Sequence, residues 1–313
     1  MFIRTITVAL AFALGACSPA LYNKEIESFS KSLTVMQASL VSVSDQAHEA
    51  TIEVAARGYL ENDIINLQVK VDCAPRSPEN CGLEEKIDGK QFPQEKLGKK
   101  MLVLMKEILT YAKSLSELAG TEDSAKVDDA VGKLGASITS LADEATKANS
   151  GIAKTTPKAI IVAAPDFLSW AVGAYVDQKR YNAMKATVTT ALPIMAETGA
   201  ILKDLMPKFN KLVIASLNGR LDNGIQYLNN GEPGATVHAK NRLAVMKDLA
   251  TTSARIRAVA SIDSNAVIDK MLNAHTKLAE AIKSGKGQGK IVFEALKKFA
   301  DQLKALAKAA SVA

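Results

Sequence analysis

The sequence has little of what metal sites are built from. Only three histidines, His48, His238 and His275, occur among its 313 residues. His48 begins the stretch HEATI, but Ile52 stands where the zinc-protease helix motif has its second histidine. Neither His238 nor His275 has a cysteine or a carboxylate at ligand spacing. The sequence therefore predicts no metal site.

Catalytic motifs are also missing. There is no nucleophile elbow, and the carboxylate pairs at 84–85 and 128–129 lie among polar residues that are typical of a solvated surface. The stretch SGKGQGK, residues 284–290, has the glycines and lysine of a phosphate-binding loop, but Ile291 follows where that motif needs a hydroxyl residue. We interpret it as a flexible joint. The sequence predicts no enzyme and no cofactor, and a site assembled from distant residues is the remaining enzymatic alternative.

Aromatic residues are scarce, at 5%, and no stretch alternates apolar and polar residues with period two, so no strands are predicted. Apolar residues instead recur in alternating steps of three and four, as in the seam of a coiled coil. The pattern occupies four stretches, Tyr22 to Val54, Leu97 to Leu118, Val127 to Ala148 and Val292 to Leu306. We expect an all-α fold, an elongated antiparallel helical bundle with several long helices, because such helices bury their apolar stripes against one another.

The lengths of the helices follow from where Gly, Pro and Asn interrupt the pattern. The first helix is predicted from about residue 22 to 70, and another long helix over 236–283. If the protein is membrane-active, the Gly-rich stretches at 219–234 and 284–289 would act as hinges. No linker is polar or long enough to separate two cores, so residues 22–313 are predicted to form a single helical-bundle domain.

The N-terminal residues have the order of a secretory signal peptide. Arg4 precedes an apolar run from Ile6 to Leu14, and small residues follow that run. The run is much shorter than the roughly 20 residues that a membrane-spanning helix needs. We therefore expect a leader that is removed and not a retained membrane helix.

The end of this leader, Leu14-Gly15-Ala16-Cys17, resembles the lipobox of bacterial lipoproteins, and the resemblance covers only the leader. It implies that residues 1–16 are a cleaved signal peptide, that Cys17 carries a diacylglyceryl/acyl anchor in the membrane, and that 17–21 form a short tether. Ser18, which is not an aspartate, implies sorting to the outer membrane, facing the periplasm or the cell surface. The alternative is an ordinary signal peptide that leaves Cys17 as a free thiol.

Once Cys17 is assigned to lipid, two cysteines remain, Cys73 and Cys81, at the ends of CAPRSPENC. An even remainder in an oxidising compartment favours a disulfide bond, which would fix the connection between two helices. A metal site would need more ligands, and no histidine lies between residues 49 and 237.

The most apolar part of the mature chain is KAIIVAAPDFLSWAVGAYV, residues 158–176. Its apolar residues cover nearly every side of a helix, so it is expected to be buried all round, in protein or in lipid. One interpretation is a central helix of the bundle, and the other is a membrane or partner segment with Asp166, Phe167 and Trp170 at its centre. Asp166 and a length below one span count against insertion in a membrane.

The predicted final helix, residues 290–311, has lysines opposite an apolar stripe of Val292, Leu296, Phe299, Leu303 and Leu306. A basic amphipathic helix can lie on an anionic membrane or dock on a partner. The favoured interpretation is that the stripe closes the bundle while the lysines face water.

Together these features favour a non-catalytic, lipid-anchored protein of the bacterial envelope that acts through protein–protein contacts as an adaptor, assembly factor or scaffold. The alternative is a membrane-active helical protein resembling pore-forming toxins, with 158–176 as the inserting segment. Nucleic acid is not expected as a partner, because an exported chain rarely meets it and no base-stacking aromatic pattern accompanies the lysines.

Overall fold

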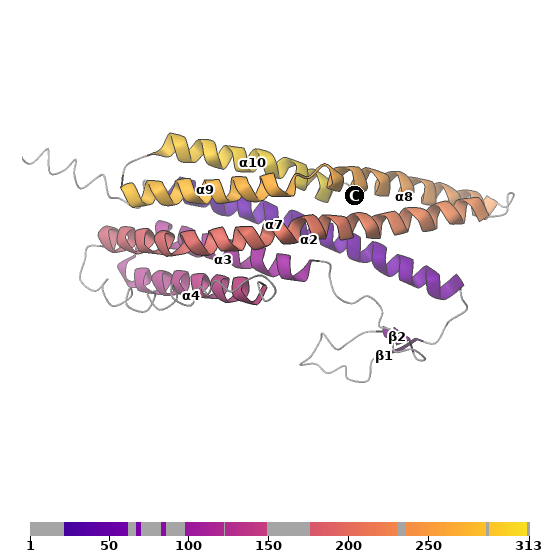
Figure 1. The fold of residues 1–313 in the computed structure, drawn as a ribbon, viewed down its shortest axis with the longest axis horizontal. Helices are drawn as coiled ribbons and strands as arrows, with labels where there is room; N and C mark the ends of the chain where they lie inside the picture. Colours follow the sequence, from indigo (N-terminus) through magenta and orange to yellow (C-terminus); the bar gives the residue numbers. More distant parts are fainter. Residues whose placement is uncertain are drawn as a thin grey trace, which may run out of the picture. The chain divides into compact units, whose positions relative to one another are not determined.

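The computed structural model describes residues 22–61, 67–69, 83–85, 98–121, 123–148, 176–230, 236–285 and 288–311. In these residues the chain forms long α-helices and one pair of short strands (Figure 1). The elements are, in chain order, α2 (Asn23–Glu61), β1 (Leu67–Val69), β2 (Leu83–Glu85), α3 (Lys99–Gly120), α4 (Ser124–Ala148), α7 (Val176–Asn230), α8 (Thr236–Ala260), α9 (Ser264–Ser284) and α10 (Gly289–Ser311). The predicted all-α helical bundle with several long helices is confirmed.

The predicted seams are the buried faces of their helices, because steps of three and four keep apolar side chains on one side. Along α2 the buried seam residues are Tyr22, Ile26, Phe29, Leu33, Met36, Leu40, Val43, Ala47 and Ala50. The seams of α3 and α4 are buried in the same way, as Tyr111 and Leu134 illustrate. The stripe of α10 is buried from Val292 to Leu306 while Lys290 is exposed, which confirms that this helix closes the bundle.

The prediction of no strands is wrong for the connection between α2 and α3. Here β1 pairs antiparallel with β2, with Leu67 opposite Glu85. Three residues are too few to show a period of two, so hydrophobic alternation could not have revealed these strands. The predicted first helix also ends earlier than residue 70, at Glu61.

Two further predicted boundaries are wrong. The predicted helix over 236–283 is divided into α8 and α9, and the side chain of Asp263 accepts a hydrogen bond of 2.9 Å from the amide of Ala266. Such an N-cap starts a new helix. The predicted hinge at 219–234 is also wrong over its first part, because Gly219 lies within α7.

The chain groups into two compact units. Unit 1 consists of Met1–Ala38, Lys100–Met206 and Asp263–Lys304, and unit 2 consists of Ser39–Lys99, Pro207–Ile262 and Ala305–Ala313. Helices α2, α7 and α10 contribute residues to both units. Within α7 the division falls at Pro207, which has no amide hydrogen to donate to the helical ladder. A single domain over residues 22–313 therefore stays a prediction.

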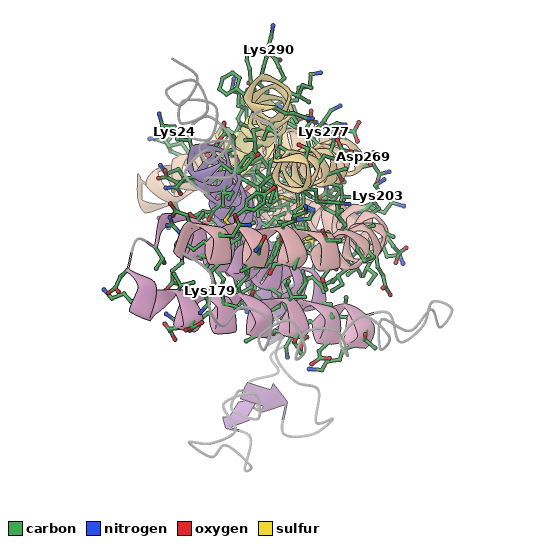
Figure 2. The ribbon with its side chains drawn as sticks, turned by 90° about the vertical axis from the view of Figure 1, so that its left-hand side faces the viewer. Lys24, Lys179, Lys203, Asp269, Lys277 and Lys290 are labelled. Atoms are coloured by element: carbon green, nitrogen blue, oxygen red, sulfur yellow. The ribbon has the colours of Figure 1, made fainter. Side chains whose placement is uncertain are left out.

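Unit 1 has an aromatic centre and a close helix contact. The ring centroids of Phe29 in α2 and Phe299 in α10 are 6.3 Å apart. Helices α7 and α9 approach closely at Gly199, where any Cβ atom would overlap the side chain of Leu272. Lys203 and Asp269 join the same two helices at 2.5 Å and lie next to each other in Figure 2.

Polar contacts link the helices of unit 2. Ser42 and Gln46 of α2 donate to the carbonyl of Ala310 in α10, at 3.2 and 3.1 Å. The Thr51 hydroxyl of α2 donates to the Ser216 hydroxyl of α7 at 2.9 Å. Each such bond contributes about 1 kcal/mol, because folding exchanges it for bonds with water.

Candidate functional site

Most of the residues that the sequence singles out lie outside the described residues. They are Cys17, Cys73, Cys81, Asp166, Phe167 and Trp170. The lipid anchor, the disulfide and the membrane or partner segment at 158–176 therefore stay predictions. Of that segment only Val176 is described, as the first residue of α7. The described part of the chain offers three other polar arrangements.

The first arrangement is a buried pair in unit 1. The Tyr111 hydroxyl of α3 and Nε2 of His275 in α9 are 2.9 Å apart. The two side chains are 0% and 1% exposed. The His275 ring also lies against Phe29, with ring centroids 5.8 Å apart. The pair is thus one hydrogen bond enclosed by apolar side chains.

Burial keeps both members of this pair uncharged. It lowers the pKa of His275 from 6.5 to about 4, because the imidazolium would lose its water in an apolar surrounding. Burial likewise raises the pKa of the Tyr111 hydroxyl. A general acid or base must reach the reacting molecule, and these side chains have no exposed surface to offer one. The geometry supports a structural role, in which the bond links α3 to α9.

No role was assigned to His275 from the sequence, although a signal for its burial was present. The residues Ile268, Met271, His275, Leu278 and Ile282 continue the alternating steps of three and four, and all are buried. A histidine on such a seam is expected to face the interior and to need a hydrogen-bond partner there. His48, by contrast, is only half-buried in α2, and the side chain of His238 lies outside the described residues.

The second arrangement lies at one end of unit 1, where the first turn of α7 meets the last turn of α3. Nη1 of Arg180 donates to the carbonyls of Ala119 and Thr121, and its Nη2 pairs with Asp177. The last carbonyls of a helix lack partners within the helix and carry partial negative charge. The buried Arg180 guanidinium therefore caps α3.

The same turn of α7 also caps α9. The Tyr181 hydroxyl donates to the carbonyl of Ile282 at 2.8 Å. Gly285 then ends α9 in the left-handed conformation, with φ of 65°. A Cβ atom at this position would lie 2.9 Å from the Tyr181 hydroxyl, so glycine is required both by the backbone and by the space.

The third arrangement is an ion-pair cluster in unit 2. Arg220 of α7 donates twice to the carboxylate of Asp248 in α8, at 2.9 and 2.6 Å. Its Nε also lies 3.1 Å from a carboxylate oxygen of Glu53 in α2. A two-pronged guanidinium–carboxylate contact fixes direction as well as distance. The cluster thus sets how α2, α7 and α8 face one another within unit 2.

Neither a metal site nor a membrane span occurs in the described residues. Nowhere in those ranges do three or more His, Cys, Asp or Glu side chains gather as they would around a metal ion. None of the described helices combines the length and the apolar character that crossing a membrane requires.

Comparison with protein-family models, curated proteins and solved structures found no match to the chain.

Proposed function

We propose that the protein is a non-catalytic, lipid-anchored protein of the bacterial envelope that acts as an adaptor, assembly factor or scaffold through contacts with other envelope proteins. Cys17 would carry the anchor, with the outer membrane as its site. The observation that carries the proposal is an exposed apolar pair on α8, in unit 2.

This pair, Leu243 and Met246, is 55% and 58% exposed. The two residues are three apart and so lie on one face of α8. An adjacent side of the helix packs on α7, since Val245 and Leu249 face Gly224 there. Apolar side chains of α8 thus extend beyond the side that packs on α7.

A surface helix that packs on one side normally has polar residues on the other. Exposed apolar side chains that gather on a second side are typical of contact surfaces for other proteins. Methionine suits such a surface because its unbranched side chain adapts to the shape of a partner. We interpret the Leu243 and Met246 face as the place where an envelope protein docks.

Site-specific photo-crosslinking in intact cells tests this proposal. A photoreactive residue in place of Met246 should give one discrete protein adduct, whereas the same residue at the exposed Lys113 of α3 should give none. Burying a side chain such as Leu243 contributes roughly 1–2 kcal/mol to an interface, so Leu243→Lys should reduce the adduct about tenfold.

The matched control is Asn241→Lys, which adds the same charge at an exposed position of the same helix. This variant should leave the adduct unchanged. The proposal of a docking face fails if Met246 and Lys113 give the same adducts, or if both lysine variants reduce the adduct equally.

A further inference from the structure

The start of α2 lies at the end of unit 1 where α3 ends and α10 begins. The side chain of Asn23 lies beside Gly120, the last residue of α3, at 3.9 Å from the position that a Cβ would take there. The carboxylate of Glu25 lies 3.4 Å from the corresponding position at Gly289, the first residue of α10. The first turns of α2 and α10 are therefore neighbours.

The surface around these turns combines positive charge with exposed apolar side chains. Ile291 and Phe293 of α10 are 53% and 62% exposed. Being two residues apart, they lie on opposite flanks of the buried stripe, and both belong to the first five residues of the helix. Lys24, Lys283 and Lys290 are exposed at the same helix ends. In Figure 2 the side chains of Lys24 and Lys290 point away from the helices. We call these five residues the anchor-proximal patch.

The acidic side chains near the patch do not cancel its charge. Glu25 is half-buried beside the start of α10, where a carboxylate is favoured by the helix dipole. Glu27 forms an ion pair with Lys31 at 2.7 Å. Glu294 is exposed on α10, one residue beyond Phe293. At this end of unit 1, Asp177 and Glu280 are likewise paired, with Arg180 and Lys277. The three lysines of the patch therefore keep a net positive charge there.

The chain that precedes α2 limits how far this patch can lie from an anchor. Four residues lie between Cys17 and Tyr22, and the five steps from one to the other span at most about 3.6 Å each in a fully extended chain, or about 18 Å in all. An acyl chain on Cys17 would place that residue at the lipid headgroups. The patch beside the first turn of α2 would then lie close to the same surface.

We propose that the anchor-proximal patch rests on an anionic membrane surface, with its lysines at the lipid phosphates and with Ile291 and Phe293 in the headgroup layer. The proposal rests on the lipid attachment at Cys17 that the proposed function includes. Lysines beside a few exposed apolar side chains are the combination by which peripheral proteins bind anionic lipid.

Vesicle sedimentation of the unanchored mature chain, residues 17–313 with Cys17→Ser, tests the patch separately from the anchor. The chain should bind vesicles of phosphatidylcholine with phosphatidylglycerol, and should bind phosphatidylcholine vesicles several-fold less. The pair Ile291→Ser with Phe293→Ser should lower the partition coefficient about tenfold. Lys24→Glu with Lys290→Glu should lower it at least as much, since each lysine contributes about fivefold near an anionic surface.

Matched controls come from unit 2. Leu212→Ser with Ile225→Ser removes a comparable pair of exposed apolar side chains, and Lys211→Glu with Lys247→Glu makes the same charge change at exposed positions. Both controls should bind vesicles as the parent chain does. The patch is refuted if the parent chain does not bind anionic vesicles, or if the controls lose as much binding as the patch variants.

Three outcomes separate this inference from the proposed function. Absence of labelled palmitate on Cys17 in cells would remove the anchor, and with it the reason to place the patch at a membrane. A photoreactive residue at Phe293 that crosslinks to a protein instead of to lipid would overturn the patch and leave the anchor standing. Absence of a protein adduct at Met246, in a chain that still binds anionic vesicles, would count against the docking face alone.

Discussion

Acid should weaken unit 1 through His275. In the folded chain burial lowers the pKa of this imidazole from 6.5 to about 4, whereas in the unfolded chain it regains its ordinary value. Between those two pH values the unfolded chain binds a proton that the folded chain does not, so the free energy of unfolding falls as the pH is lowered. The stability that depends on a neutral His275 is fully present above about pH 6.5 and is lost by about pH 4. The difference between the two pKa values corresponds to about 3 kcal/mol in the free energy of unfolding.

Urea unfolding followed by circular dichroism, at several pH values across that window, measures the effect. The control is the double variant Tyr111→Phe with His275→Leu, which removes the titrating ring and also removes the hydroxyl that would lose its partner. All ionisable groups other than Tyr111 and His275 are the same in both proteins, so the difference between the two curves isolates His275. Equal losses of stability in both proteins between about pH 6.5 and pH 4 would refute the reasoning.

Two further predictions concern the helix ends of unit 1. Gly285→Ala should lower the free energy of unfolding by roughly 1 kcal/mol or more, because the backbone of residue 285 is left-handed and the new Cβ would meet Tyr181. Gly132→Ala, at an exposed position of α4 with open space around it, should raise the free energy of unfolding by about 0.5–1 kcal/mol. Thermal midpoints that move in the same direction for both would contradict this. Arg180→Ala should lower the free energy of unfolding, measured in urea, by about 2 kcal/mol, because three hydrogen-bond partners lose their donor. Lys185→Ala, on the exposed side of α7, should change this free energy by less than about 0.5 kcal/mol. If Arg180→Ala lowers the free energy of unfolding no more than Lys185→Ala does, Arg180 does not cap α3.

The sequence predicted the helical seams well because burial of a helix face imposes a period on many residues at once. The stretch from Tyr22 to Ala50 repeats this period through four heptads, and each of its apolar seam residues is buried. A single misplaced residue would not hide such a signal. Fold class could therefore be read before any contact was known.

Boundaries set by a few residues could not be predicted in the same way. The break between α8 and α9 depends on one carboxylate, Asp263, which accepts the amide of Ala266, and the apolar pattern continues on both sides of it. The stretch SIDS does contain this cap, because Asp263 precedes a new apolar stripe that begins at Val267. A search for caps within long predicted helices would have found it.

The polar contacts between helices were not predictable, since they join residues that are far apart in the sequence. Tyr111 and His275 are separated by 164 residues, and Arg180 and Ala119 by 61. The sequence placed Tyr111 on a seam, but it did not say which helix faces that seam. Only the packing of α3 against α9 brings the hydroxyl to the imidazole.

The two proposed contact surfaces share one feature that a sequence can show. Ile291 and Phe293 lie outside the buried stripe of α10, and Leu243 and Met246 lie away from the face of α8 that packs on α7. Apolar residues that contribute to a stripe are explained by the core, so they say little about partners. Apolar residues that the period places outside the buried stripe have no such explanation, and each leaves roughly 1–3 kcal/mol of transfer free energy unused in the isolated chain. A membrane or a protein that covers them recovers this free energy, which is why these four residues, and not the more numerous seam residues, are the positions to change first.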